Sequence, residues 1–152
     1  MNRAHFLSYE IPASGGGMKD VVGLFNHDNF ARSLPETKTV LSASLISGNH
    51  TVGAFYRMIS DYETTNPPNA LGVANGLGQE IDEFNVLDLK YSYNFDMDDS
   101  SLRLSLGVKN ATDEEVPMFY DASNFSYDTR QHDPRGKTVS YTHLTLPTIF
   151  AV

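Results

Sequence analysis

The sequence predicts an all-β protein. It is expected to be an antiparallel up-and-down meander that forms a partial transmembrane β-barrel, with short periplasmic turns and long extracellular loops. Apolar and polar residues alternate with a period of two in several segments, and no segment shows the 3.6-residue period of an amphipathic helix. Short turns also alternate with long polar loops, which is typical of membrane barrels and uncommon in compact soluble domains.

The alternation is clearest in residues 84–95 and 102–109, which we expect to be two antiparallel strands. A turn over residues 96–101 would pair Phe95 with Leu102 and place Asp88 opposite Lys109, as a cross-strand ion pair. The residues expected on the apolar face are Leu87, Leu89, Tyr91, Tyr93, Phe95, Leu102, Leu104, Leu106 and Val108.

Residues 37–47 and 50–62 are expected to form a second hairpin. Gly48 and Asn49 between them both tolerate positive φ, which a two-residue turn requires. The register that keeps apolar faces together pairs Leu45 with Val52, and Leu41 with Tyr56.

Three long connections, residues 12–36, 63–83 and 111–136, are polar and rich in Gly, Pro and Asn. Alternation alone does not distinguish a membrane barrel, whose apolar face meets lipid, from a soluble sandwich, whose apolar face is the core. The aromatic residues Tyr91, Tyr93 and Phe95 beside a short turn favour the barrel, because aromatic side chains gather at membrane interfaces.

Composition excludes several classes of function. The chain has 152 residues, a formal net charge of −8 and no Cys, so we expect no nucleic-acid partner, no disulfide and no Cys-based metal site. No apolar run is long enough for a membrane helix, and the first residues lack the apolar core of a signal peptide. We therefore expect the chain to begin inside a longer reading frame.

Five segments together resemble the C-terminal part of the barrel of TonB-dependent outer-membrane receptors. Residues 29–63 are similar to a late hairpin of that family, and residues 83–95 and 102–109 to its penultimate strands. Asn110, Ala111, Thr112 and Asp113 resemble its N-L-F-D-type motif. Asp133, Pro134, Arg135 and Gly136 resemble the D-P-R-G-R-type start of its last strand.

The resemblance implies a fragment of a receptor in the bacterial outer membrane, whose barrel of about 22 strands holds a plug. Such receptors import a scarce nutrient, here a siderophore, vitamin, haem or oligosaccharide. The implied partners are outer-membrane lipid, the small nutrient and, through a plug that this chain lacks, the TonB complex. No enzymatic activity and no cofactor are expected. Two alternatives stay open: a fragment of a passive porin or specific channel, and a soluble β-domain that binds carbohydrate or protein.

The last residues do not fit the family pattern. Residues 139–148 resemble a translated transposase adapter from sequencing libraries, and Pro147 would interrupt the ladder of a closing strand. We therefore expect residues 1–138 to be receptor strands and loops, and residues 139–152 to be a non-native tail in place of the last strand.

No catalytic and no metal-binding residues are expected. The pairs His27-Asp28 and His132-Asp133 lie in polar loops without a third ligand at a fixed spacing. Residues expected to face the barrel lumen, where they would pair with one another or with the plug, are Arg57, Asp61, Asp88, Lys90, Arg103 and Lys109. Loop residues that a substrate could contact are Tyr62, Tyr120 and Tyr127.

Overall fold

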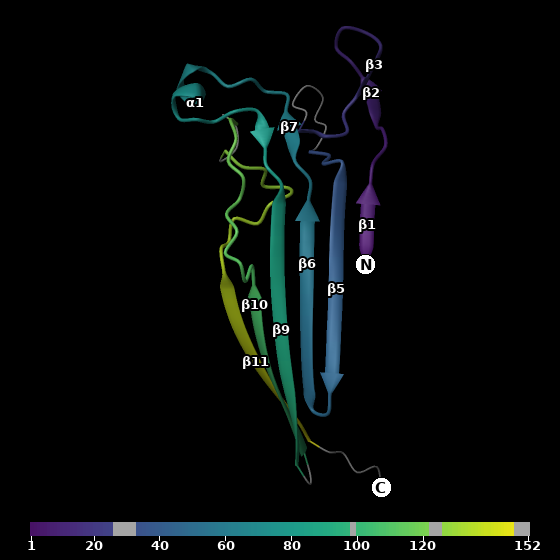
Figure 1. Cartoon of the computed structure of the whole chain (residues 1–152), viewed down its shortest axis with the longest axis vertical. Coiled ribbons are helices and arrows are strands. Elements are labelled where there is room, and N and C mark those ends of the chain that lie inside the picture. Colours follow the sequence, from purple (N-terminus) through teal and green to yellow (C-terminus); the bar gives the residue numbers. More distant parts are fainter. Residues whose placement is uncertain (26–32, 98–99, 122–125, 148–152) are drawn as a thin grey trace. The chain divides into compact units, whose positions relative to one another are not determined.

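The computed structural model describes residues 1–25, 33–97, 100–121 and 126–147. Its main sheet has six strands in the order β1-β5-β6-β9-β10-β11. Figure 1 shows β5, β6 and β9 running side by side in alternating directions, which confirms the expected all-β, antiparallel meander. Within the described residues the sheet is open, with β1 and β11 at its edges. The strands are β1 (Asn2–His5), β5 (Thr37–Ser47), β6 (His50–Ile59), β9 (Phe84–Met97), β10 (Ser100–Lys109) and β11 (Thr138–Pro147).

The chain divides into two compact units. The strand unit comprises Leu41–Tyr56, Val86–Glu114 and Arg135–Val152. The loop unit comprises Met1–Val40, Arg57–Asn85 and Glu115–Pro134.

The register of β9 and β10 is the one expected from the sequence. Leu102 lies opposite Phe95, and the ladder runs without a bulge to Val108 opposite Leu89. The next step along the ladder brings Lys109 opposite Asp88. The expected turn over residues 96–101 is wrong, because Asp96 pairs with Ser101 and Met97 with Ser100. Polar side chains at these positions do not end the strands, because the hydrogen bonds of the ladder are made by backbone groups. Residues 98–99 lie outside the described residues.

β5 and β6 form the expected hairpin around Gly48 and Asn49. Gly48 has a φ of 55°, whereas Asn49 is not among the positive-φ residues; positive φ at the first central residue only is typical of a type II′ turn. At the far end, the Ser60 N–H donates to the Thr37 carbonyl at 3.0 Å. Both ends fit the register that pairs Leu45 with Val52.

The loop unit contains more structure than three polar connections would suggest. β2 (Glu10–Pro12) pairs with β3 (Met18–Asp20), while β4 (Leu24–Phe25), β7 (Tyr62–Thr64) and β8 (Glu80–Ile81) form a three-stranded sheet. The short helix α1 (Ala70–Ala74) is capped by Asn69, whose side chain accepts from the Gly72 N–H at 2.9 Å. Among the described residues, no helix has the length and apolar character needed to cross a bilayer.

The two units differ in where their apolar side chains lie. Phe25, Tyr62, Ile81 and Phe119 form a buried cluster in the loop unit, with the Phe25 and Phe119 rings edge-to-face at 5.8 Å. Of the eight buried apolar residues in the described part of the chain, only Val86 belongs to the strand unit. The loop unit therefore has a hydrophobic core, and the strand unit has almost none.

Candidate functional site

The strand unit presents one apolar and one polar sheet face. Successive side chains of a strand point to opposite faces, so the registers of β9, β10 and β11 place Leu106, Tyr91 and Tyr141 together. Large apolar side chains of the strand unit that are exposed on this face are Leu41, Leu45, Val52, Leu89, Tyr91, Phe95, Met97, Leu104, Leu106, Val139 and Tyr141. We call this surface the apolar face. Large apolar side chains exposed on the opposite face are Ile46, Phe55 and Leu144.

Polar side chains pair across the opposite face of β9 and β10. The Ser92 and Ser105 hydroxyl oxygens lie 2.8 Å apart, and the Arg103 Nε donates to the Asn94 side-chain oxygen at 2.7 Å. Gly107 lies opposite Lys90 in the same ladder. This polar face is therefore organised by hydrogen bonds rather than by packing.

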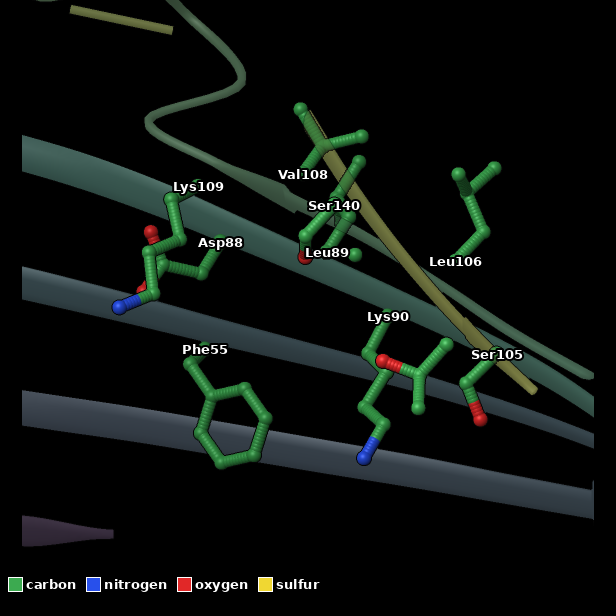
Figure 2. A pocket seen from close by; sticks show the side chains of 11 residues that line it. Phe55, Asp88, Leu89, Lys90, Ser105, Leu106, Val108, Lys109 and Ser140 are labelled. Carbon is green, nitrogen blue, oxygen red and sulfur yellow. The ribbon is translucent and has the colours of Figure 1, made fainter. Parts of the chain in front are cut away.

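A hollow of about 410 Å³ lies on the sheet here, lined among others by Phe55, Asp88, Lys90, Ser105 and Lys109. In Figure 2, Lys90 and Ser105 point to one side of the strands, whereas Leu106 and Val108 point to the other. Four of the expected lumen residues, Asp88, Lys90, Arg103 and Lys109, thus share one polar face. The hollow also includes Ser140 and Thr142 of β11, the segment expected to be non-native.

Asp88 has a role that the sequence did not reveal. One carboxylate oxygen accepts a hydrogen bond from the Asn110 backbone N–H at 3.0 Å. Asp88 therefore fixes the end of β10 in addition to facing Lys109 across the ladder. The ion pair with Lys109 remains a prediction.

We expect a double-mutant cycle with Asp88→Asn and Lys109→Gln to give a coupling of a few tenths of a kcal/mol. Asn keeps an acceptor for the Asn110 N–H, so the cycle measures the charge interaction and not the lost hydrogen bond. The measurement is chemical unfolding in detergent micelles at low salt. A coupling that is zero, or unchanged at high salt, would contradict an ion pair.

The other two expected lumen residues belong to the loop unit. Arg57 is an exposed residue of β6. Asp61 is also exposed, and β6 ends at Ile59, so strand alternation does not assign Asp61 to either face; its lumen-facing position remains a prediction.

The three tyrosines proposed as substrate contacts are only partly available at the surface. Tyr62 is 3% exposed, and its hydroxyl donates to the Asp128 carboxylate at 2.8 Å. Burial, followed by the charge of Asp128 and this hydrogen bond, raises the pKa of Tyr62. Tyr120 packs so closely on Gly72 that a Cβ there would lie 2.4 Å from its ring. Tyr127 is half-buried. Contact of these residues with a substrate remains a prediction.

His132 is a buried histidine beside this tyrosine–aspartate pair. It is 4% exposed, its ring centroid lies 5.0 Å from that of Phe84, and neither ring nitrogen has a hydrogen-bond partner among the described residues. Burial lowers the pKa of His132; the charge of Asp128 acts in the opposite direction, and Lys38 adds to the lowering.

Acid is therefore expected to destabilise the loop unit. The unfolded chain binds a proton at His132 more tightly than the folded chain, so stability falls as pH drops below about 6.5, the unfolded value. The slope from this one group is at most about 1.4 kcal/mol per pH unit. We expect His132→Phe to lose less stability than the wild type between pH 7.5 and 5.5, measured by hydrogen exchange in the loop unit. Equal losses would show that His132 is not responsible.

Aromatic side chains gather at the turn end of the apolar face, as the sequence predicted. The ring centroids of Tyr93 and Phe95 are 4.4 Å apart. His50, which the alternation of the strands did not indicate, completes the cluster: its ring lies 4.6 Å from that of Tyr93, and its Nδ1 lies 2.8 Å from the Tyr91 hydroxyl. The position of His50 directly after the turn of Gly48 and Asn49 was the sequence feature that could have indicated its place in the cluster.

Within the described ranges, no three side chains of His, Asp or Glu are grouped as a metal site requires. His27 and Asp28 lie outside these ranges. No family model, curated protein or solved structure matches the chain.

Proposed function

We propose that the chain is the C-terminal part of the barrel of a TonB-dependent receptor in the bacterial outer membrane. Its strand unit forms barrel wall, with the apolar face toward lipid and the polar face toward the lumen. The parent receptor imports a small nutrient. The order of motifs in this chain, from the late hairpin to the D-P-R-G segment, supports the family assignment.

The observation that carries the membrane assignment is the exposed apolar face of a unit with almost no core. In water, a unit of this kind would leave a continuous apolar surface hydrated, and such patches destabilise soluble monomers. A bilayer removes that cost, because its hydrocarbon chains solvate Leu, Val and aromatic side chains. A porin fragment would show the same two faces, so the family assignment depends on the motifs.

Spin labels on adjacent residues test which face of the strand unit is in contact with lipid. Because the chain has no Cys, single cysteines can be placed with Leu89→Cys and Leu104→Cys on one face, and Lys90→Cys and Ser105→Cys on the other. In lipid vesicles, we expect oxygen, which partitions into lipid, to reach the first pair preferentially. A water-soluble nickel complex should reach the second pair.

Two results would overturn the proposal in different ways. A chain that stays monomeric without detergent and does not bind to lipid vesicles would be the soluble β-domain. If the accessibility of the spin labels alternates as expected, but the upstream coding DNA encodes no plug, the result would instead favour a passive channel.

A further inference from the structure

Asn110 and Asp113 shape a tight turn directly after β10. Asn110 is 5% exposed, with a φ of 50°, a conformation that Asn adopts more readily than most residues. Its side chain accepts from the Glu114 N–H and donates to the Glu114 carbonyl, both at 2.9 Å. Asp113 also has a positive φ, of 59°, and its N–H donates to the Asn110 carbonyl. Hydrogen bonds within residues 110–114 therefore stabilise the turn.

The turn is also attached to β9. The Asn110 N–H donates to Asp88 at 3.0 Å, and the Ala111 N–H donates to the Leu87 carbonyl at 2.7 Å. The Asp113 carboxylate is therefore presented at a fixed place relative to the β9–β10 pair.

This carboxylate holds the chain where β11 begins. Asp113 Oδ1 accepts from the Lys137 backbone N–H at 2.7 Å. A Cβ on Gly136 would lie 2.9 Å from the same oxygen, so glycine permits the close approach. The next residue, Thr138, makes the first pair of the ladder, with Lys109.

The side-chain pattern of β11 does not itself specify that register. Val139 and Tyr141 lie opposite Val108 and Leu106 on the apolar face. Beyond them the pattern is inverted: His143 lies opposite Leu104, and Leu144 lies opposite Arg103. A shift by one residue would bring Leu144 to the apolar face but remove Val139 and Tyr141 from it, so hydrophobicity favours neither register clearly.

We propose that Asn110, Asp113 and Gly136 form a clamp that sets the register in which the last strand joins the edge of β10. The clamp precedes residue 139, so it acts on whichever strand follows Lys137. It works through backbone and carboxylate contacts and requires no particular side chain in that strand.

Disulfide trapping in the full chain, refolded in detergent micelles, tests this clamp. Val108→Cys with Val139→Cys reports the observed register, and Val108→Cys with Tyr141→Cys reports a two-residue shift. With Asp113 intact, we expect the first pair to oxidise at least about tenfold more than the second. Asp113→Ala removes a charge-assisted hydrogen bond and should lower this ratio about tenfold.

Controls separate a lost register from a lost fold. Asp113→Asn retains an acceptor and should largely keep the ratio, and Glu114→Ala should leave it unchanged, because Glu114 contributes only backbone groups to the turn. Tyr93→Cys with Leu104→Cys should still oxidise in every variant if β9 and β10 remain paired. Should Asp113→Ala keep both this cross-link and the original ratio, the clamp does not set the register.

Discussion

Leu104→Arg is expected to destabilise the chain in lipid vesicles by about 2–4 kcal/mol, the cost of a charged side chain near the bilayer midplane on the outer face of a barrel. Leu104 lies near the middle of β10 and on its apolar face. The matched control, Ser105→Arg, is expected to cost about 1 kcal/mol, the usual net value of its lost hydrogen bond with Ser92. Ser105 faces the open hollow, which has room for the longer side chain.

Urea unfolding of vesicle-inserted protein measures this difference. In water, Leu104→Arg should instead reduce aggregation, because it interrupts an exposed apolar stripe. Equal destabilisation by the two arginines would show that both faces have the same environment, and neither face would then be in contact with lipid.

Phe119→Ala is expected to destabilise the loop unit by about 3–5 kcal/mol, the usual cost of removing a fully buried aromatic ring. Phe119 is completely buried and packs edge-to-face on Phe25, so the substitution removes both apolar burial and a ring contact. Met118→Ala, at an exposed neighbouring position, should cost less than about 1 kcal/mol.

Hydrogen exchange resolves where this loss occurs. The Thr64 and Tyr120 amides, bonded to the Gln79 and Gly78 carbonyls, report on the loop unit. The Asn94 amide, bonded to the Asn49 carbonyl, reports on the strand unit. Phe119→Ala should speed exchange at the first two and leave the third unchanged. Faster exchange at all three would mean that the units unfold together.

The sequence predicted β5, β6, β9 and β10 well because each of these strands has its own period-two pattern. It did not predict β11, whose pattern is inverted midway and whose residues were expected to be a non-native tail. The register of β9 and β10 followed from matching apolar faces, and that of β5 and β6 from Gly48 at the turn. Neither inference needed information about residues distant in the chain.

The loop unit could not be predicted in the same way. Phe25, Tyr62, Ile81 and Phe119 are isolated apolar residues in polar segments, and only the folded chain brings them together. For the same reason, Tyr62 was expected at a substrate surface, whereas its hydroxyl is bonded to Asp128. The roles of Asn110 and Asp113 were also hidden, because a motif does not show which backbone groups its side chains will bind.

The short β1 strand has a consequence for how the protein behaves at high concentration. β1 pairs only with residues 37–40 of β5, so among the described residues no strand covers the outer edge of residues 41–47. The amide and carbonyl groups along that edge can accept a strand from another molecule. In the proposed parent barrel, the preceding strand would occupy this edge. For the isolated chain, we expect intermolecular sheet growth from β5, with a rate that increases steeply with protein concentration.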